Sequence, residues 1–491
     1  METKGLTRGA KRKYEGEHGG SRVKDGFRDE DYFRNLYAVE PDFHRLGTKY
    51  AEFGSMLIRN GNLDFTDPAA VMQLTKTLLK EDFGIEIELL PDRLCPPVPN
   101  RHNYILWLKE LIDSTAPSYS DQYEPERTVK GLDIGTGASL IYPLLGCVQR
   151  PRWHFIATDV DQASLASARR NAALNHLVSR IRIVGRAPSD ALIPLDELQV
   201  SHLDFVMVNP PFYASETELL ELAGQKSRPP HSACTGAPVE MVCTGGEVEF
   251  VKRMIHESLA LRERVQWYTA MLGKQSSLEH LIDVIRGHGV SNFTVTTFTQ
   301  GTKTRRWALG WTFSSRRPSQ RASRASFSSL SSASSAWKRM LPPPTEISME
   351  VAVTGLHRDA IVSVQKLICD TMAAMDLRSW VWEEGRLRGV GLAEGNVWSR
   401  AYRRRQSSKM TPAAQEITSP SPPLSLAACP FGFSITIHKQ DTEVGSAGPL
   451  AVILRWLQGT DDSLFESFLG VIRRCLRSVG APGGPDLGEI A

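Results

Sequence analysis

Apolar residues in the middle of the chain alternate between short continuous runs and longer stretches with helical spacing. The short runs predict strands at Gly131–Ile134, His154–Thr158, Ile181–Val184, Phe205–Val208, Val265–Leu272, Phe293–Thr297 and Trp307–Phe313. Strands that alternate with helices form a parallel sheet covered on both faces. We therefore predict an α/β domain built on a mostly parallel, seven-stranded sheet.

The segment before this domain changes character near residue 30. Residues 1–30 are rich in Gly, Lys, Arg and Glu and have few large apolar groups, which predicts a flexible basic arm. A helix is expected after Asp67, which suits an N-cap, with Pro68 in its first turn. A second helix is expected near Tyr104–Ile112. These helices would extend the domain to residues 31–313.

A Ser-rich stretch with interspersed Arg, ending in a run of prolines, follows the domain. Its composition predicts a disordered linker over residues 314–348. Beyond it, Met349–Val353 and Phe431–His438 have strand patterns, and Asp359–Ala374 and Ser463–Leu476 have helical spacing. We predict a small α+β unit over residues 349–480, split by a disordered insert at 407–423, and a tail at 481–491.

Composition narrows the class of protein only slightly. Hydrophobic residues make up 41% and charged residues 23% of the chain, no apolar run is long enough to cross a bilayer, and the net charge of +3 does not identify a nucleic-acid binder. The 7 cysteines form no CxxC pair, so we expect a reducing compartment and no structural zinc or other metal. The short basic run Lys11–Lys13 is either a nuclear import signal or part of a solvated tail.

A glycine-rich turn follows the first predicted strand of the sheet, in Gly131–Ser139 (GLDIGTGAS). Side chains at Gly135 or Gly137 would keep a ligand from approaching the backbone closely. A dinucleotide fold would carry a third glycine where this chain has Leu140, and the pattern instead resembles methyltransferase motif I, which binds S-adenosylmethionine. A glycine turn of this kind also occurs for purely steric reasons.

Two carboxylates accompany this turn. Asp159 ends the next predicted strand, where it can accept hydrogen bonds from both ribose hydroxyls of the cofactor. Asp133 either contacts the ligand or only fixes the geometry of the turn.

The tetrapeptide Asn209-Pro210-Pro211-Phe212 follows the most continuous apolar strand, at the sheet edge where open α/β sheets bind ligands. The Asn209 side-chain oxygen and the Pro210 carbonyl can accept both hydrogens of a planar exocyclic amine, which leaves its lone pair aimed at the sulfonium methyl group. The prolines stiffen the loop, and Phe212 offers a face for stacking the base. The alternative is a rigid loop that only closes a strand.

With both motifs in place, the chain resembles the eukaryotic U6 small nuclear RNA adenine-N6 methyltransferases of the methyltransferase-like sixteen type, which are related to the bacterial RlmF-type ribosomal RNA enzymes. The resemblance covers about residues 40–313. It rests on further segments, namely 67–71 (DPAAV), 78–84 (LLKEDFG), 101–107 (RHNYILW), 135–146 (GTGASLIYPLLG), 245–253 (GGEVEFVKR), 267–274 (WYTAMLGK) and 306–311 (RWALGW). It implies a class I, Rossmann-like methyltransferase domain, S-adenosylmethionine as cofactor, a structured RNA as partner and a nuclear or cytoplasmic location.

The resemblance also implies roles for residues of the cofactor and catalytic sites. Arg101 would contact the cofactor carboxylate, whereas without the resemblance it would be a surface ion pair. Gly135, Ser139 and Asp159 would contact the cofactor, although the family commonly has Glu in place of Asp159. The tetrapeptide matches without change, and Tyr213 replaces a second Phe that is often found there but can still stack.

Two basic segments are candidates for RNA contacts. Lys226 and Arg228 lie in the long loop after Phe212, which helps to hold RNA in the family; the alternative is a solvated insertion. The family tends to carry more Arg here, where this chain has Ser227. The segment 397–405 (VWSRAYRRR) bears Arg400, Arg403, Arg404 and Arg405 beside two aromatic residues, and is either an RNA-binding surface or a charged helix end.

Two rival functions remain open. A protein-glutamine methyltransferase would act on the same kind of planar nitrogen, but that class usually has Tyr where this chain has Phe212. An RNA-binding scaffold with little turnover is the other rival, and the intact Asn209 and glycine turn weigh against it.

Overall fold

The computed structural model describes residues 28–213, 215, 217, 236–300, 304–328, 340–351, 357–409, 429–439 and 450–477. The chain divides into two units, Met1–Pro41 and Asp42–Ala491. The first contains helix α1 (Glu30–Asn35), which is capped by Asp29 accepting a hydrogen bond from the Tyr32 amide at 2.7 Å. Lys11–Lys13 lies outside the described residues. Within these ranges, no helix has the length and apolar character needed to span a bilayer.

The second unit begins with a set of helices: α2 (Phe43–Lys49), α3 (Ala51–Gly54), α4 (Pro68–Leu78), the π-helical turn η1 (Leu79–Phe83) and α5 (Val98–Ser114). Asp67 caps α4, because its carboxylate accepts a hydrogen bond from the Ala69 amide at 2.9 Å. This confirms the predicted helix start. Helix α5 begins earlier than predicted, and it carries Arg101 near its N-terminal end in a buried position.

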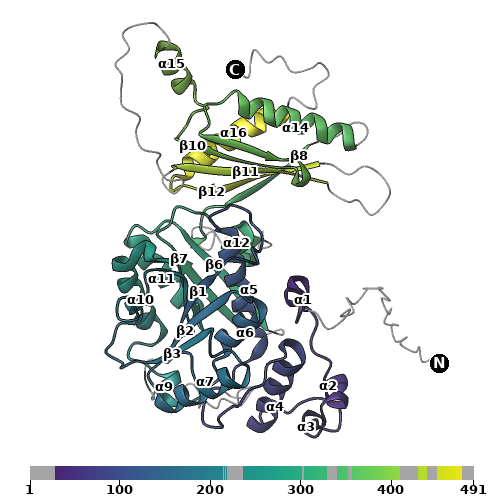
Figure 1. The fold of residues 1–491 in the computed structure, drawn as a ribbon, viewed down its shortest axis with the longest axis vertical. Coiled ribbons are helices and arrows are strands. Elements are labelled where there is room, and N and C mark those ends of the chain that lie inside the picture. The colour runs from purple at the N-terminus through teal and green to yellow at the C-terminus, as the bar shows by residue number, and fades with distance from the viewer. Residues whose placement is uncertain are drawn as a thin grey trace, which may run out of the picture. The chain divides into compact units, whose positions relative to one another are not determined.

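A seven-stranded sheet forms the centre of this unit, in the order β3-β2-β1-β4-β5-β7-β6 (Figure 1). Its strands are β1 (Val129–Ile134), β2 (Trp153–Asp159), β3 (Ile181–Gly185), β4 (Leu203–Val208), β5 (Val265–Leu272), β6 (Phe293–Gln300) and β7 (Thr304–Trp311). The pairings are parallel from β3 to β5, and β7 runs antiparallel to both β5 and β6. The predicted strands and the mostly parallel α/β fold are confirmed.

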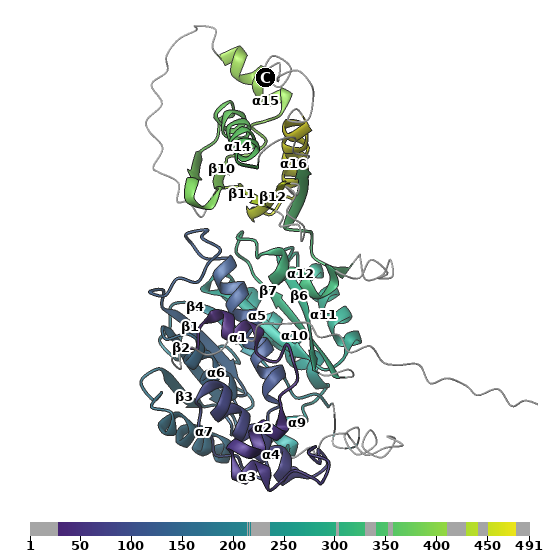
Figure 2. The same ribbon diagram turned by 90° about the vertical axis from the view of Figure 1, so that its right-hand side faces the viewer.

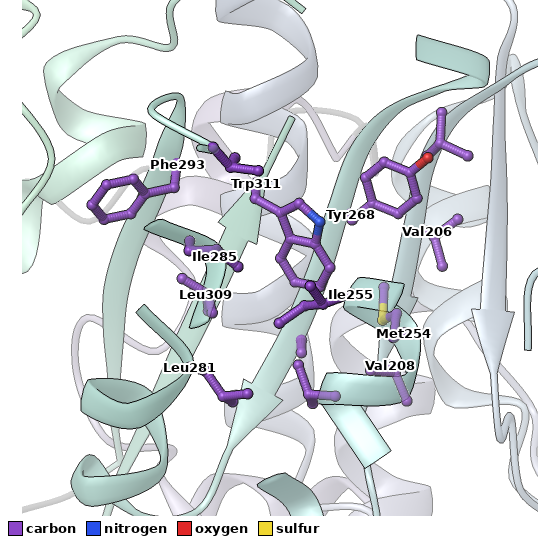
Figure 3. Close-up of a cluster of buried hydrophobic side chains, with 14 of the residues drawn as sticks. Val206, Val208, Met254, Ile255, Tyr268, Leu281, Ile285, Phe293, Leu309 and Trp311 are labelled. Atoms are coloured by element: carbon purple, nitrogen blue, oxygen red, sulfur yellow. The ribbon is translucent and has the colours of Figure 1, made fainter. Parts of the chain in front are cut away.

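Helices lie on both sides of this sheet: α5 and α6 (Ile141–Gln149) on one side, α10 (Gly246–Leu261) and α11 (Gln275–Gly287) on the other (Figure 1). Helix α7 (Gln162–Leu174) packs on β2 and β3, and the 3-10 turn η2 (Arg262–Arg264) leads from α10 into β5. The rings of Tyr268 and Trp311, both labelled in Figure 3, stack at 5.7 Å between centroids. The Trp311 indole donates a hydrogen bond to Ser258 of α10 at 3.0 Å. This buried cluster locks the antiparallel strand β7 beside β5.

The structure differs from the expected linker over residues 314–348. Helix α12 (Gln320–Ser328) packs on β6, and the carbonyl oxygen of Ala322 accepts hydrogen bonds from the Trp107 indole at 2.8 Å and from the Thr294 hydroxyl at 2.6 Å. Small Ala and Ser side chains let this helix approach the sheet closely. The Ser-rich composition predicted disorder because it lacks large apolar residues, but contacts with distant elements order residues 314–328.

The C-terminal part contains an antiparallel sheet of five strands in the order β8-β12-β11-β10-β9. They are β8 (Glu346–Val351), β9 (Ser379–Glu383), β10 (Arg388–Ala393), β11 (Phe431–Lys439) and β12 (Leu450–Gln458), and the 3-10 turn η3 (Glu384–Arg386) joins β9 to β10. Helices α14 (His357–Ala373) and α16 (Asp462–Arg477) pack together on it (Figure 2), and α15 (Arg400–Lys409) follows β10. The predicted strands and helices of this α+β unit are present, but the sequence pattern did not reveal β9, β10 and β12.

The missed strand β10 has glycines where strands usually carry branched residues. A side chain at Gly389 would meet the Trp380 ring at 2.0 Å, and one at Gly391 would meet the Phe433 ring at 2.3 Å. The glycines therefore make room for aromatic rings of the neighbouring strands. That role depends on strand pairing, so the sequence pattern of β10 alone could not show it.

Buried arginines join the C-terminal sheet to the segment that follows α5. Asp121 accepts a hydrogen bond from Arg388 at 2.9 Å and forms an ion pair with Arg455, which also donates to the Ser114 carbonyl at 2.8 Å. Arg317, just after β7, stacks on the Trp456 ring at 4.0 Å and donates to the Gly459 carbonyl at 2.7 Å. Because these guanidinium groups are buried, each needs the acceptors that the other part supplies.

We expect Asp121→Ala to lower the free energy of unfolding by about 3 kcal/mol, because it leaves Arg388 and part of Arg455 buried without their carboxylate. Urea unfolding of the full chain would measure this. Glu126→Ala is the matched control: Glu126 lies in the same segment but forms an exposed ion pair with Arg152, so its loss should cost less than about 1 kcal/mol. Equal effects of the two changes would show that the Asp121 cluster does not hold the parts together.

Candidate active site

The two sequence motifs meet at one edge of the seven-stranded sheet. Strands β1 and β4 pair in parallel, with Ile134 opposite Val208. Gly135 and Asn209 directly follow these two strands, so they lie side by side at the carboxyl edge of the sheet. This is the edge at which open α/β sheets bind ligands.

The turn after β1 requires glycine on conformational grounds. Gly135 and Gly137 have φ angles of +68° and +67°, in the left-handed region that other residues rarely adopt. A Cβ atom at Gly135 would meet no atom within 4 Å among the described residues, and one at Gly137 would meet only Glu240 Oε1, at 3.5 Å. The turn therefore presents bare backbone to open space, as a cofactor site needs. Ser139 is buried directly after it.

Asp159, at the end of β2, holds this turn in place. Its Oδ2 accepts a hydrogen bond from the Gly137 amide at 2.8 Å, and its Oδ1 accepts one from the Asp161 amide at 2.9 Å. Burial raises the pKa of this carboxyl. Each carboxylate oxygen can accept a further hydrogen bond, so the predicted contacts with ribose hydroxyls remain compatible with this arrangement.

Asp133 bonds within the turn, as one of its two interpretations predicted. Its Oδ2 accepts a hydrogen bond from the Thr136 hydroxyl at 2.7 Å, and its buried Oδ1 has no hydrogen-bond partner in the described part of the chain. Burial raises the pKa of Asp133 to about 7, against the opposing effect of the Thr136 hydrogen bond.

Arg101 is not a surface ion pair. Only 5% of the residue is exposed, its Nη1 lies 3.5 Å from the Met271 sulfur, and its guanidinium lies 5.5 Å from the centre of the Tyr142 ring. Among the described residues it forms no salt bridge, although its charge acts on Asp133. A buried guanidinium in this position fits the carboxylate of a ligand.

In the tetrapeptide, the side-chain oxygen of Asn209 is buried and has no hydrogen-bond partner among residues 28–213 or the other described segments. Buried polar atoms normally have partners, so this oxygen is available to a ligand. The Tyr104 hydroxyl donates to Thr269 at 2.9 Å on the adjacent strand β5 and lies 3.5 Å from the Val208 carbonyl. These contacts buttress the strand end from which Asn209 emerges.

Phe212 is held by residues that the sequence did not single out as site residues. A Cβ atom at Gly273 would lie 3.0 Å from the Phe212 ring, so the ring packs directly on backbone. Buried Glu247 fixes that backbone by accepting hydrogen bonds from the amides of Gly273 at 2.6 Å and Lys274 at 3.1 Å. On β7, the Arg306 guanidinium lies 5.5 Å from the ring centre. All three residues fall in segments that carry the family resemblance, which was the available signal.

The predicted RNA-binding residues are spread over the chain. Tyr213 pairs with the segment that returns to the site, because its amide donates to the Met241 carbonyl and its carbonyl accepts from the Cys243 amide, both at 3.0 Å. Lys226 and Arg228 lie outside the described residues. Arg400, Arg403, Arg404 and Arg405 are exposed on α15 in the C-terminal part. No group of His, Cys, Asp or Glu in the described segments could hold a metal ion.

A family model described as RNA methyltransferase matches residues 28–315, which is more than half of the chain. The chain belongs to the RNA methyltransferase family. The match ends shortly after β7, so the C-terminal α+β unit of this family member lies outside it.

Named relatives of the chain agree with the family match. The chain is 46% identical over 289 residues to the RNA N(6)-adenosine-methyltransferase mettl16 of Danio rerio, covering 57% of this chain and 58% of that protein. It is 40% identical over 269 residues to the U6 small nuclear RNA (adenine-(43)-N(6))-methyltransferase of Schizosaccharomyces pombe, covering 55% and 67%. The chain therefore spans little more than half the length of its vertebrate relatives.

A solved structure supports the fold of the family domain. The crystal structure of the hMettl16 catalytic domain in complex with MAT2A 3′UTR hairpin 1 is 44% identical in sequence and matches with a TM-score of 0.51. The match covers 57% of this chain and 94% of that one. The seven-stranded domain is a class I methyltransferase fold.

We expect the stability of the cofactor-free protein to depend on pH through Asp133. Between about 4, the ordinary pKa of an aspartate, and its raised value of about 7, the folded protein binds a proton that the unfolded chain has released. The contribution of Asp133 to stability therefore falls as the pH rises through this window.

Asp133→Asn removes this titration, so the variant should gain stability relative to the parent as the pH rises from about 5 to about 8. Urea unfolding of both proteins across this range would measure the difference. A difference that stays constant with pH would mean that Asp133 does not titrate in the window.

Proposed function

We propose that this chain transfers a methyl group from S-adenosylmethionine to the N6 amine of an adenine in RNA. The observation that carries the proposal is the buried Asn209 oxygen beside the glycine turn, which has no hydrogen-bond partner among the residues that the structure describes. Family membership and the names of the relatives support the choice of RNA and adenine. A structured RNA of the U6 small nuclear type is the substrate class that these names favour.

The glycine turn, Asp159 and Arg101 fit the cofactor. Gly135 and Gly137 leave the backbone open, Asp159 supplies acceptors for ribose hydroxyls, and buried Arg101 supplies a guanidinium for the carboxylate. When bound, S-adenosylmethionine supplies the electrophilic methyl group. The residues of the chain position the cofactor, and Arg101 provides the charge that neutralises its carboxylate.

Asn209 orients the amine that is methylated. The lone pair of an exocyclic adenine amine is delocalised into the ring, so the nitrogen is a poor nucleophile while it stays planar. The Asn209 oxygen and the Pro210 carbonyl accept its two hydrogens and thereby favour the tetrahedral nitrogen. Because β4 and the prolines hold both acceptors before the base arrives, little reorganisation accompanies the reaction.

Phe212 provides the surface on which the base stacks. Its ring rests on Gly273, whose backbone is fixed by Glu247, so its position is set before RNA binds. An aromatic platform fits a nucleobase better than the side-chain amide of a glutamine. This arrangement and the family match favour RNA over a protein substrate, and the available Asn209 oxygen favours an enzyme over a scaffold.

We expect Asn209→Ala to lower the single-turnover rate of methyl transfer on the order of a hundredfold, with little change in RNA or cofactor affinity. The lost oxygen acts mainly as the amine becomes tetrahedral. Tyr213→Phe is the control, because it keeps the ring that stacks and should leave the rate nearly unchanged. Labelled-methyl transfer to a short U6-like RNA, with and without its adenine, would measure both, and near-normal turnover by Asn209→Ala would rule out the amine-orientation mechanism.

We expect the exposed arginines of α15 to increase RNA affinity without taking part in methyl transfer, since every proposed catalytic residue precedes residue 314. Replacing Arg400, Arg403, Arg404 and Arg405 by Gln should weaken RNA binding and lower the salt slope by roughly 0.7 to 0.9 for each phosphate that is no longer neutralised. S-adenosylmethionine affinity should stay the same. Arg152→Gln with Arg170→Gln, two arginines in surface ion pairs, is the control. An unchanged salt slope would assign α15 another role.

A further inference from the structure

Glu240 lies beside the glycine turn, although the two are far apart in the sequence. It belongs to the short helix α9 (Pro238–Met241). Backbone pairing of Tyr213 with Met241 and Cys243 connects this helix to the catalytic loop, the proposed catalytic segment Asn209–Phe212. Its Oε1 is the only atom within 4 Å of the point where a Cβ of Gly137 would stand, at 3.5 Å, among the described residues. One carboxylate oxygen therefore faces the backbone that a cofactor must approach.

The other oxygen of Glu240 fixes the orientation of the side chain. Oε2 accepts hydrogen bonds from the Leu94 amide at 2.8 Å and from the Ala237 amide at 3.1 Å. These amides come from the segment before α5 and from the start of α9, so the carboxylate joins two parts of the site rim. With Oε2 held in this way, Oε1 is directed toward the turn before any ligand binds.

An ionised carboxylate can accept hydrogen bonds but cannot donate them, so a ligand at Oε1 must present a donor. The donors of S-adenosylmethionine are its ribose hydroxyls, its ammonium group and its adenine amine. Both carboxylates border Gly137: Asp159 accepts a hydrogen bond from its amide at 2.8 Å, and Glu240 Oε1 lies 3.5 Å from its Cβ position. Asp159 ends β2, the position at which such folds bind a ribose. The ribose hydroxyls are therefore the donors that this location favours.

We propose that Glu240 is a second carboxylate of the cofactor site and accepts a hydrogen bond from one ribose hydroxyl. This inference rests on the proposed use of S-adenosylmethionine. Asp159, which already accepts amides from Gly137 and Asp161, would then share the diol with Glu240. The bound ribose would also stabilise the position of α9. Through the backbone pairing at Tyr213, it would thereby stabilise the neighbouring catalytic loop.

The test is calorimetric titration of the full chain with S-adenosylhomocysteine and with its 2′-deoxy and 3′-deoxy analogues. Glu240→Gln keeps an oxygen for the amides of Leu94 and Ala237 but removes the charge at Oε1. We expect it to bind S-adenosylhomocysteine about tenfold or more weakly, as for loss of a hydrogen bond to a charged group. For the analogue that lacks the bonded hydroxyl, the parent and Glu240→Gln should bind within about twofold of each other. Glu249→Gln, a change in the exposed partner of Lys252, is the matched control and should change none of the three affinities.

An equal loss of affinity for all three ligands would overturn the proposal and assign Glu240 to the ammonium group or to the rim alone. No loss for any ligand would overturn it as well. If Glu240→Gln folds poorly, Glu240→Ala is measured instead, and the ratio of its affinities for S-adenosylhomocysteine and for the deoxy analogue tests the proposal. Partial unfolding lowers both affinities equally and leaves this ratio unchanged. Failure of the parent protein to bind S-adenosylhomocysteine would instead contradict the proposed function.

Discussion

The parallel register between β1 and β4 is the constraint on which the candidate site depends. Ile134 lies opposite Val208, and this places the glycine turn and Asn209 at adjacent strand ends. The register is fixed by packing: a side chain at Gly131 would meet the Phe205 ring at 2.2 Å, so the ring of β4 fills the space over β1. A shift of one strand by one residue would turn its side chains to the opposite face of the sheet and move Asn209 out of line with the glycine turn.

Three carboxylates near these strand ends accept hydrogen bonds from backbone amides of the surrounding segments. Asp159 holds Gly137, Glu247 holds Gly273 and Lys274, and Glu240 holds Leu94 and Ala237. Each of these hydrogen bonds fixes a segment that borders the site and brings negative charge to it. The guanidinium groups of Arg101 and Arg306 lie at the same site, and burial together with the charge of Arg101 lowers the pKa of Arg306. The backbone segments and the charged groups of the site are thus in place before any ligand binds. Such preorganisation suits a reaction that depends on positioning.

The C-terminal sheet is held to the methyltransferase domain by a different kind of contact. Arg317, Arg388 and Arg455 are buried and bond to a carboxylate or to backbone carbonyls across the boundary. Such groups lose their hydration on burial, so they contribute more to the specificity of the arrangement than to its stability. The helix with the exposed arginines, α15, is part of the same unit as Asn209 and the glycine turn.

Local spacing and turn-forming residues were enough to predict the strands of the seven-stranded sheet, the start of α4 and the motifs that follow β1 and β4, because these features depend on neighbouring residues of the chain. Which distant residues complete the candidate site depends on the tertiary fold and could not be predicted in this way. The contacts of Glu240 with the glycine turn and of Arg306 with Phe212 join segments far apart in the chain, and no periodicity marks them. Long-range packing also explains why the sequence pattern predicts a linker in place of α12 and no strand at β10. Both segments are rich in small residues, which give weak local signals. They become ordered when larger residues of other elements pack against them.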